Sequence, residues 1–257
     1  MIAIFDLIDA VGRDGFIAFL AVFVRVGGAI ALLPAFGERA IPERIRLVLA
    51  IAFSILVAPM VFPVIRPLIE AETGLGFLVF EVIAGLAIGI SVRLLIMALQ
   101  TAGSIAAQST SLSQIFGGSA TDPQPAIGHI LFVGGLCLAV MMGLHVKLLS
   151  VFVLSYDVFV PGGFFEAGVF SDWGILQIGK SFSLAFSLAA PFMIASLIYN
   201  VALGVINRAM PQLMVAFVGA PAITAGGLIL LAIIAPLLFE TWRAAFLPVL
   251  DDPFGAR

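Results

Sequence analysis

The feature that most constrains the fold of this chain is a series of apolar runs, each long enough to cross a membrane as a helix. A helix rises about 1.5 Å per residue, so about 20 apolar residues cross the roughly 30 Å of bilayer hydrocarbon. The runs that reach this length are Phe16–Ala35, Leu47–Ile65, Phe77–Gln100, Ile127–Leu149, Leu176–Asn200 and Leu213–Phe239. No alternation of period two is sustained, as a membrane β-barrel would require. Because helices satisfy their own backbone hydrogen bonds in lipid, the sequence predicts an all-α membrane protein of about six long hydrophobic helices.

Composition supports a membrane protein and excludes several other classes. Of the 257 residues, 62% are hydrophobic and only 11% are charged, and the mean hydropathy is +1.23. Soluble domains carry about 25% charged residues. The net charge of −3 offers no basic excess for nucleic acid. The single cysteine, Cys137, excludes an intrachain disulfide and a cysteine-rich metal site. With no composition boundary and no clear internal repeat, we expect one domain over residues 1–257.

Sequence signatures of enzymes are missing. The two histidines, His129 and His145, do not belong to an H-E-x-x-H helix, so the zinc protease signature is missing. There is no glycine-rich phosphate loop and no nucleophile elbow. An intramembrane protease would need an acidic pair, which the apolar runs lack, or a serine–lysine pair, and no serine is marked as the partner of Lys147 or Lys180. We therefore expect no catalysis, no cofactor and no bound metal.

Charged residues lie inside the apolar runs, among them Arg25, Glu81 and Arg93, and Lys180 lies near the start of the fifth run. A lone charge at the bilayer centre costs about 2.5–3.5 kcal/mol on insertion scales, so each must face a partner, a cavity or a helix end. Glu81 and Arg93 lie about 18 Å apart along a helix and cannot pair with each other. Two interpretations stay open for these charges. They either form internal ion pairs and snorkel to helix ends, or they mark an aqueous path or a subunit contact.

Small residues form a second pattern. Gly85 and Gly89 make a G-x-x-x-G motif, and Gly103 follows on the same segment. Such spacing allows helix backbones to approach closely. The contact could lie within the chain or between subunits.

A polar stripe ends the fifth run. Asn200, Gly204, Asn207 and Pro211 follow one another at steps of four, three and four residues, so they share one face of a helix. Buried amides without hydrogen bonds cost about 1–3 kcal/mol each. A partner helix of the same or another chain is therefore expected against this stripe.

A flexible polar stretch interrupts the apolar chain near its centre. It reads QSTSLSQIFGGSATDPQP over residues 108–125 and carries one charge, Asp122. Gly117 and Gly118 lack a Cβ atom and change conformation at little cost. The simplest interpretation of this stretch is a surface loop.

Three longer blocks resemble the FliR family of flagellar export-gate proteins, whose virulence counterparts belong to injectisomes. The blocks are Arg25–Ala50, Glu81–Gln108 and Tyr199–Ile223, and their order and spacing agree with the family. The short sequences PAFGE and IPERIR within the first block favour the flagellar branch of the family. The positions that carry the resemblance are Pro34, Gly37, Pro42, Arg44, Arg46, Glu81, Gly85, Gly89, Gly103, Gln108, Asn200, Gly204, Arg208, Pro211, Gln212 and Pro221.

The resemblance implies a subunit of a protein export gate. Such proteins join FliP-like and FliQ-like membrane subunits, and irregular helical hairpins build part of a hetero-oligomeric helical channel. An FlhB-like protein docks on this channel, and an FlhA-like protein lies below it. Unfolded flagellar proteins pass through, driven by proton motive force. The expected location is the bacterial inner membrane, within the flagellar basal body and in contact with membrane lipid.

The resemblance also implies roles for particular residues. In the family, the loop that follows the glutamine of the second block plugs the channel. That glutamine is Gln108 here, which predicts a plug at Ser109–Thr121. Relatives often carry Gln-X-Gly at this turn, whereas this chain reads Gln108-Ser109-Thr110. The expected plug residues are Gln108, Ser109, Ser111, Ser113, Ile115, Phe116, Gly117 and Gly118. The expected subunit-packing residues are Gly85, Gly89, Gly103, Asn200, Gly204, Arg208, Pro211 and Gln212.

The alternative function is a six-span solute transporter. A transporter would need a midplane site with convergent polar groups and a matched pair of broken helices. Pro191, Pro221 and Pro236 could break helices, but the two halves of the sequence contain no matched pair of interrupted segments.

Overall fold

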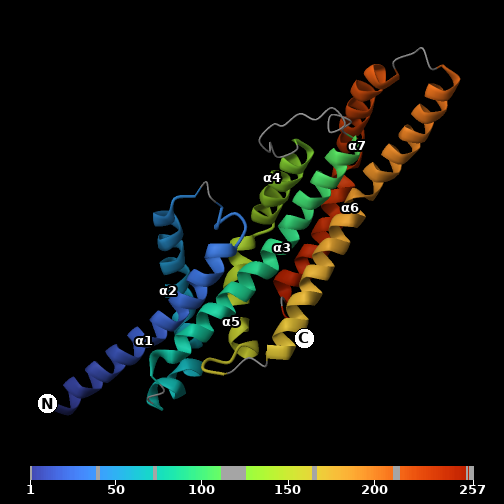
Figure 1. Ribbon diagram of the computed structural model, residues 1–257. Coiled ribbons are helices and arrows are strands. Elements are labelled where there is room, and N and C mark those ends of the chain that lie inside the picture. Colours follow the sequence, from blue (N-terminus) through green and yellow to red (C-terminus); the bar gives the residue numbers. More distant parts are fainter. Residues whose placement is uncertain are drawn as a thin grey trace. The chain divides into compact units, whose positions relative to one another are not determined.

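In the computed structural model, helices are the regular secondary structure of the described residues, and short turns connect them (Figure 1). These residues are 2–38, 41–71, 74–110, 126–163, 167–210, 215–252 and 254. The helices are α1 (Ile2–Leu32), α2 (Glu43–Glu70), the short 3-10 helix η1 (Leu75–Phe77), α3 (Leu78–Thr110), α4 (Ala126–Met141), α5 (Leu144–Val158), α6 (Ala167–Ala209) and α7 (Val215–Asp251). Within these ranges no strand occurs, and the predicted all-α class is confirmed.

The helices match the predicted membrane spans in length and apolar character. Five helices of the described structure are long and apolar enough to cross a membrane. The pair α4 and α5 passes the same test only as one broken span, because the two helices meet at a bend of 72°. Counting that pair as one gives up to six spans, in agreement with the sequence.

The break between α4 and α5 corrects one sequence expectation. The run Ile127–Leu149 was expected to be continuous, but Gly143 within it adopts a left-handed conformation with φ 78°. Glycine reaches this conformation without the steric cost that a Cβ atom imposes. The three prolines that could break helices do not, since Pro191 lies within α6 and Pro221 and Pro236 lie within α7. A proline removes one hydrogen bond, whereas positive φ turns the backbone out of the helix.

The helices form two compact units. Unit 1 comprises Met1–Arg93, Ala139–Leu176 and Leu247–Arg257, and unit 2 comprises Leu94–Leu138 and Gln177–Phe246. Each unit draws on segments that are far apart in the sequence. No single cut of the chain would therefore separate one unit from the other.

The core of unit 1 lies where α2 packs against α1 and α5. Val57 and Ile65 of α2 are fully buried. Phe53 of α2 meets Phe152 of α5 edge to face, with ring centroids 5.9 Å apart. These contacts bury one side of α2 and leave its other side exposed.

The core of unit 2 is anchored by Trp242 of α7. Its side chain is fully buried and stacks on Phe246 with ring centroids 4.4 Å apart. The indole Nε1 donates to the backbone oxygen of Leu95 on α3 at 2.9 Å. This hydrogen bond satisfies the only polar atom of a large buried side chain.

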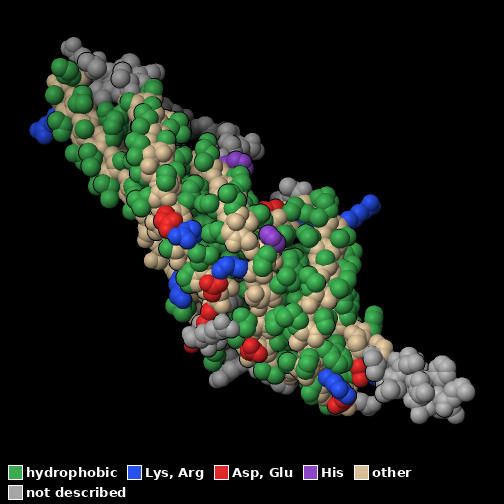
Figure 2. Space-filling model, turned by 180° about the vertical axis from the view of Figure 1, so that it is seen from behind, with side chains coloured by type: hydrophobic (Ala, Val, Ile, Leu, Met, Phe, Trp, Pro, Cys, Tyr) green, Lys and Arg blue, Asp and Glu red, His purple; other side chains and the backbone are tan. Residues whose placement is uncertain are grey.

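Large apolar side chains also cover much of the outer surface. Figure 2 shows apolar side chains over most of the visible face and few charged ones. On α6 the side chains of Phe182, Leu197, Ile198 and Val205 are more than half exposed. A surface of this kind is covered by lipid or by other proteins, because water would solvate it poorly.

Candidate functional site

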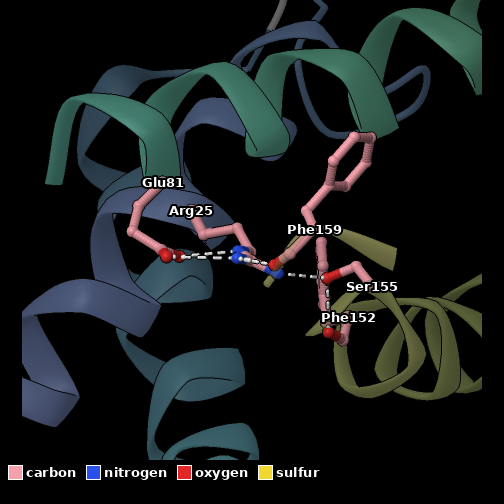
Figure 3. A network of polar contacts seen from close by, with 5 residues as sticks. All are labelled: Arg25, Glu81, Phe152, Ser155 and Phe159. Carbon is pink, nitrogen blue, oxygen red and sulfur yellow. Dashed lines mark hydrogen bonds and ion pairs between the residues drawn. The ribbon is translucent and has the colours of Figure 1, made fainter. Parts of the chain in front are cut away.

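A buried polar cluster in unit 1 forms around Arg25 (Figure 3). Arg25 lies on α1 and Glu81 on α3, and each side chain is only 1% exposed. Arg25 Nε donates to Glu81 Oε2 at 2.6 Å, and Arg25 Nη2 donates to Glu81 Oε1 at 3.1 Å. The guanidinium and the carboxylate thus form a bidentate pair, the strongest geometry for this type of hydrogen bond.

The same guanidinium also holds the end of α5. Arg25 Nη1 donates to Ser155 Oγ at 2.9 Å, and Arg25 Nη2 donates to the backbone oxygen of Phe159 at 2.8 Å. Ser155 Oγ donates in turn to the backbone oxygen of Phe152 at 2.7 Å. The last carbonyls of a helix lack donors and carry partial negative charge, which a cation stabilises. The ring of Tyr156 completes the cluster, 3.5 Å from the guanidinium carbon.

This cluster decides between the interpretations of two intramembrane charges. Arg25 and Glu81 form an internal ion pair, enclosed by three helices of the same chain. The sequence alone did not predict this ion pair, because the two residues are 56 positions apart. Ser155 and Tyr156 were also missed, although two polar residues at the end of an apolar run were a usable signal.

Arg93 lies near the middle of α3, and its guanidinium meets the end of α1. Its Nη1 atom donates to the backbone oxygen of Leu32, the last residue of α1, at 3.2 Å. The positive charge therefore faces the negative end of the α1 dipole.

The three glycines of the small-residue pattern are buried against helices of their own chain. A Cβ atom at Gly85 would collide with the backbone oxygen of Arg25, and one at Gly89 would lie 2.6 Å from that of Ala29. A Cβ atom at Gly103 would collide with the backbone of Gly128 on α4. The predicted close approach is present, but within one chain. Within the chain, these glycines contact α1 and α4, and their proposed role in subunit packing stays a prediction.

The polar stripe of α6 has a different environment. Asn200, Gly204 and Arg208 are exposed, and no atom of the described structure lies near a Cβ placed on Gly204. The amide nitrogen of Asn200 donates to Ser196 Oγ at 3.2 Å. Pro211 and Gln212 lie outside the described residues.

The expected plug falls mostly outside the described structure. Gln108 and Ser109 belong to the last turn of α3, where Ser109 Oγ donates to the backbone oxygen of Ala106 at 2.8 Å. Helix α3 includes Gln108, Ser109 and Thr110, so the first two expected plug residues are helical. The remaining plug residues lie outside the described residues: Ser111, Ser113, Ile115, Phe116, Gly117 and Gly118.

A pocket of about 330 Å³ opens in unit 2 between the end of α3, α6 and α7. Three hydroxyl side chains line it, those of Thr110, Ser196 and Tyr199. Each already donates to a backbone carbonyl: Thr110 to Ala106 at 3.0 Å, Tyr199 to Gly219 at 2.7 Å, and Ser196 to Ser109. The other described lining residues are apolar, so the part of the pocket that the structure describes offers few free polar groups to hold a polar solute. The sequence did not indicate it.

Comparison with known proteins gives a consistent result. The family described as "Bacterial export proteins, family 1" matches residues 16–248. The flagellar biosynthetic protein FliR of Caulobacter vibrioides is 35% identical over 233 residues, which cover 90% of this chain and 93% of that protein. The protein of the same name from Bacillus subtilis is 28% identical, over 91% of this chain and 92% of its own length. That of Escherichia coli is 28% identical, over 84% and 83%.

Proposed function

Because the chain belongs to family 1 of the bacterial export proteins, we propose that it is a subunit of the flagellar type III export gate. It is an integral membrane component of the flagellar export apparatus. In this proposal it joins FliP-like and FliQ-like subunits in the bacterial inner membrane and forms with them the channel for unfolded flagellar proteins. FlhB-like and FlhA-like proteins complete the apparatus, and the chain itself catalyses no reaction and holds no cofactor.

The observation that carries the proposal is the extent of the match. Alignment with the FliR proteins covers about nine-tenths of the chain and includes all three blocks that carried the resemblance. A likeness limited to apolar helices would be less specific, because many membrane proteins share that composition. Here the matched region includes the connecting segments as well as the helices.

The exposed side of α6 supports an assembly with other subunits. Asn200 and Arg208 are polar and exposed on a helix whose neighbouring side chains, Leu197 and Val201, are apolar and more than 60% exposed. Polar groups on an apolar surface need partners with hydrogen-bonding groups. We therefore keep Asn200, Gly204, Arg208, Pro211 and Gln212 as the proposed contact with another subunit.

Copurification tests the assembly. The chain carrying an affinity tag is extracted in mild detergent from cells that express the whole flagellar apparatus. We expect FliP-like and FliQ-like proteins to be recovered with it in fixed stoichiometry. Recovery of a stable monomer alone, across several detergents, would contradict the proposal and would favour the solute transporter.

The segment after α3 is the proposed plug. Hydroxyl and glycine residues there offer contacts that do not depend on the sequence of a passing chain, and Ile115 and Phe116 are large enough to fill a narrow bore. We expect that deleting Ser113–Ser119 leaves the complex intact and makes the membrane leak ions. The measurement is the conductance of membranes that contain the assembled complex. Intact complexes with unchanged conductance would rule out the plug while leaving the assembly in place.

A further inference from the structure

Helix α2 carries three prolines at four-residue intervals, Pro59, Pro63 and Pro67. Proline has no backbone N–H, so the carbonyl four residues before it loses its helical donor. The carbonyls affected belong to Ile55, Pro59 and Pro63. They follow one another at a spacing of about 6 Å, one helical turn apart. We call Ile55, Pro59, Pro63 and Pro67 the proline face.

The proline face lies opposite the side by which α2 packs on its own chain. The buried side chains Phe53, Val57, Val61 and Ile65 are offset from it by two positions, about 200° around the helix. Ile55 is 59% exposed, and the three prolines are exposed as well. Among the described residues of unit 1, no helix packs over this face.

The surroundings of these carbonyls are apolar. Leu56, Met60 and Val64 flank the proline face and are 56%, 64% and 42% exposed. No charged residue occurs from Leu47 to Ile65, and Arg66 beyond that stretch already pairs with Glu70. Acyl chains of lipids cannot donate hydrogen bonds, and a carbonyl left without a donor in lipid costs several kcal/mol. A binding partner that fits this face has an apolar surface and carries uncharged hydrogen-bond donors.

We propose that the proline face of α2 is a docking surface for a helix of another protein subunit that presents Ser, Thr, Asn or Gln side chains at four-residue spacing. Such a helix repeats its donors every 6 Å or so, the same spacing as the free carbonyls. Hydroxyl and amide side chains are the groups that join helices across apolar interfaces. The inference rests on the proposed function, because it takes the partner to be a subunit of the export apparatus.

The test places a photocrosslinking residue, p-benzoylphenylalanine, at Val64 of the full chain in native membranes. In the P63A variant the new backbone N–H satisfies the carbonyl of Pro59 within α2. We expect the yield of crosslinked partner to fall about threefold with P63A, and about thirtyfold when Pro59, Pro63 and Pro67 all become alanine. Both variants should also raise the unfolding midpoint of the isolated chain, because each restores helical hydrogen bonds. The matched control is P191A in α6, which leaves the crosslinking yield unchanged.

Sequencing of the crosslinked product decides the identity of the occupant. An apolar peptide with Ser, Thr, Asn or Gln at four-residue spacing supports the proposal. A photoproduct on lipid alone, a partner peptide without such donors, or a yield that P63A does not lower would overturn it.

The copurification experiment separates this outcome from the proposed function. If FliP-like and FliQ-like proteins copurify while the probe at Val64 labels only lipid, the docking surface is wrong and the export gate stands. If the probe labels a donor-bearing helix of an unrelated protein and those two proteins are not recovered, the export gate is wrong, and so is the partner proposed for this face.

Discussion

Replacing Glu81 by glutamine removes the charge that balances Arg25 in the core of unit 1. Both side chains are 1% exposed, so water cannot replace the lost carboxylate. Breaking a buried ion pair by removing one partner costs about 3–5 kcal/mol, because the remaining charge stays buried. The amide of glutamine still accepts one hydrogen bond from the guanidinium, so we expect a loss near the lower end, about 3 kcal/mol.

The matched control for E81Q is E70Q. Glu70 pairs with Arg66 at 2.8 Å, nearly the distance of the buried pair, but the two side chains are 56% and 59% exposed. Exposed pairs contribute about 0–1 kcal/mol, since water solvates both ions when the pair is broken. The two variants thus remove the same chemical group from an arginine–glutamate pair, and the buried pair also has a second hydrogen bond.

The assay is thermal or denaturant unfolding of the purified chain in one detergent, followed by circular dichroism. We expect E81Q to lower the unfolding midpoint strongly and E70Q to leave it nearly unchanged. The double variant R25M/E81L removes both charges and should recover much of the loss, because no unpaired charge remains. Equal midpoints for E81Q and E70Q would refute the argument that burial of Arg25 makes its partner necessary.

Three further substitutions test separate contacts. The variant G85A should destabilise the chain by about 1–3 kcal/mol through overpacking against α1, whereas G204A on the open surface of α6 should not, as unfolding midpoints of both would show. The variant G143A should lower the free energy of unfolding by about 1–2 kcal/mol from backbone strain alone, because φ is 78° there and no atom of the described structure lies near the added methyl group. An unfolding midpoint equal to that of the parent would contradict this. The variant W242F should lower the free energy of unfolding by about 1–3 kcal/mol, because it removes the indole donor to the backbone oxygen of Leu95 and shrinks a buried ring. A loss smaller than that of a surface substitution, measured in the same unfolding assay, would argue against a stabilising role for Trp242.

The sequence determined the fold class and the number of apolar segments. Lipid leaves no partner for backbone polar groups, so a run of about 20 apolar residues has few options other than a helix. The same local rule predicted that helices cover these runs, but the helices extend well beyond them: α3 to Thr110, α6 over Ala167–Ala209 and α7 to Asp251. The family resemblance also rested on local patterns, and the comparisons confirmed it.

Tertiary structure alone decided which groups meet. Arg25 and Glu81 looked like separate intramembrane charges until the packing of α1 on α3 brought them within 2.6 Å. Gly85 looked equally suited to a contact within the chain or between subunits, and only the position of α1 showed the contact within the chain. The bend at Gly143 was invisible to hydropathy, because an apolar run has the same mean whether it is straight or broken. Hydropathy is a sum over neighbours in sequence, whereas pairing and close approach depend on neighbours in space.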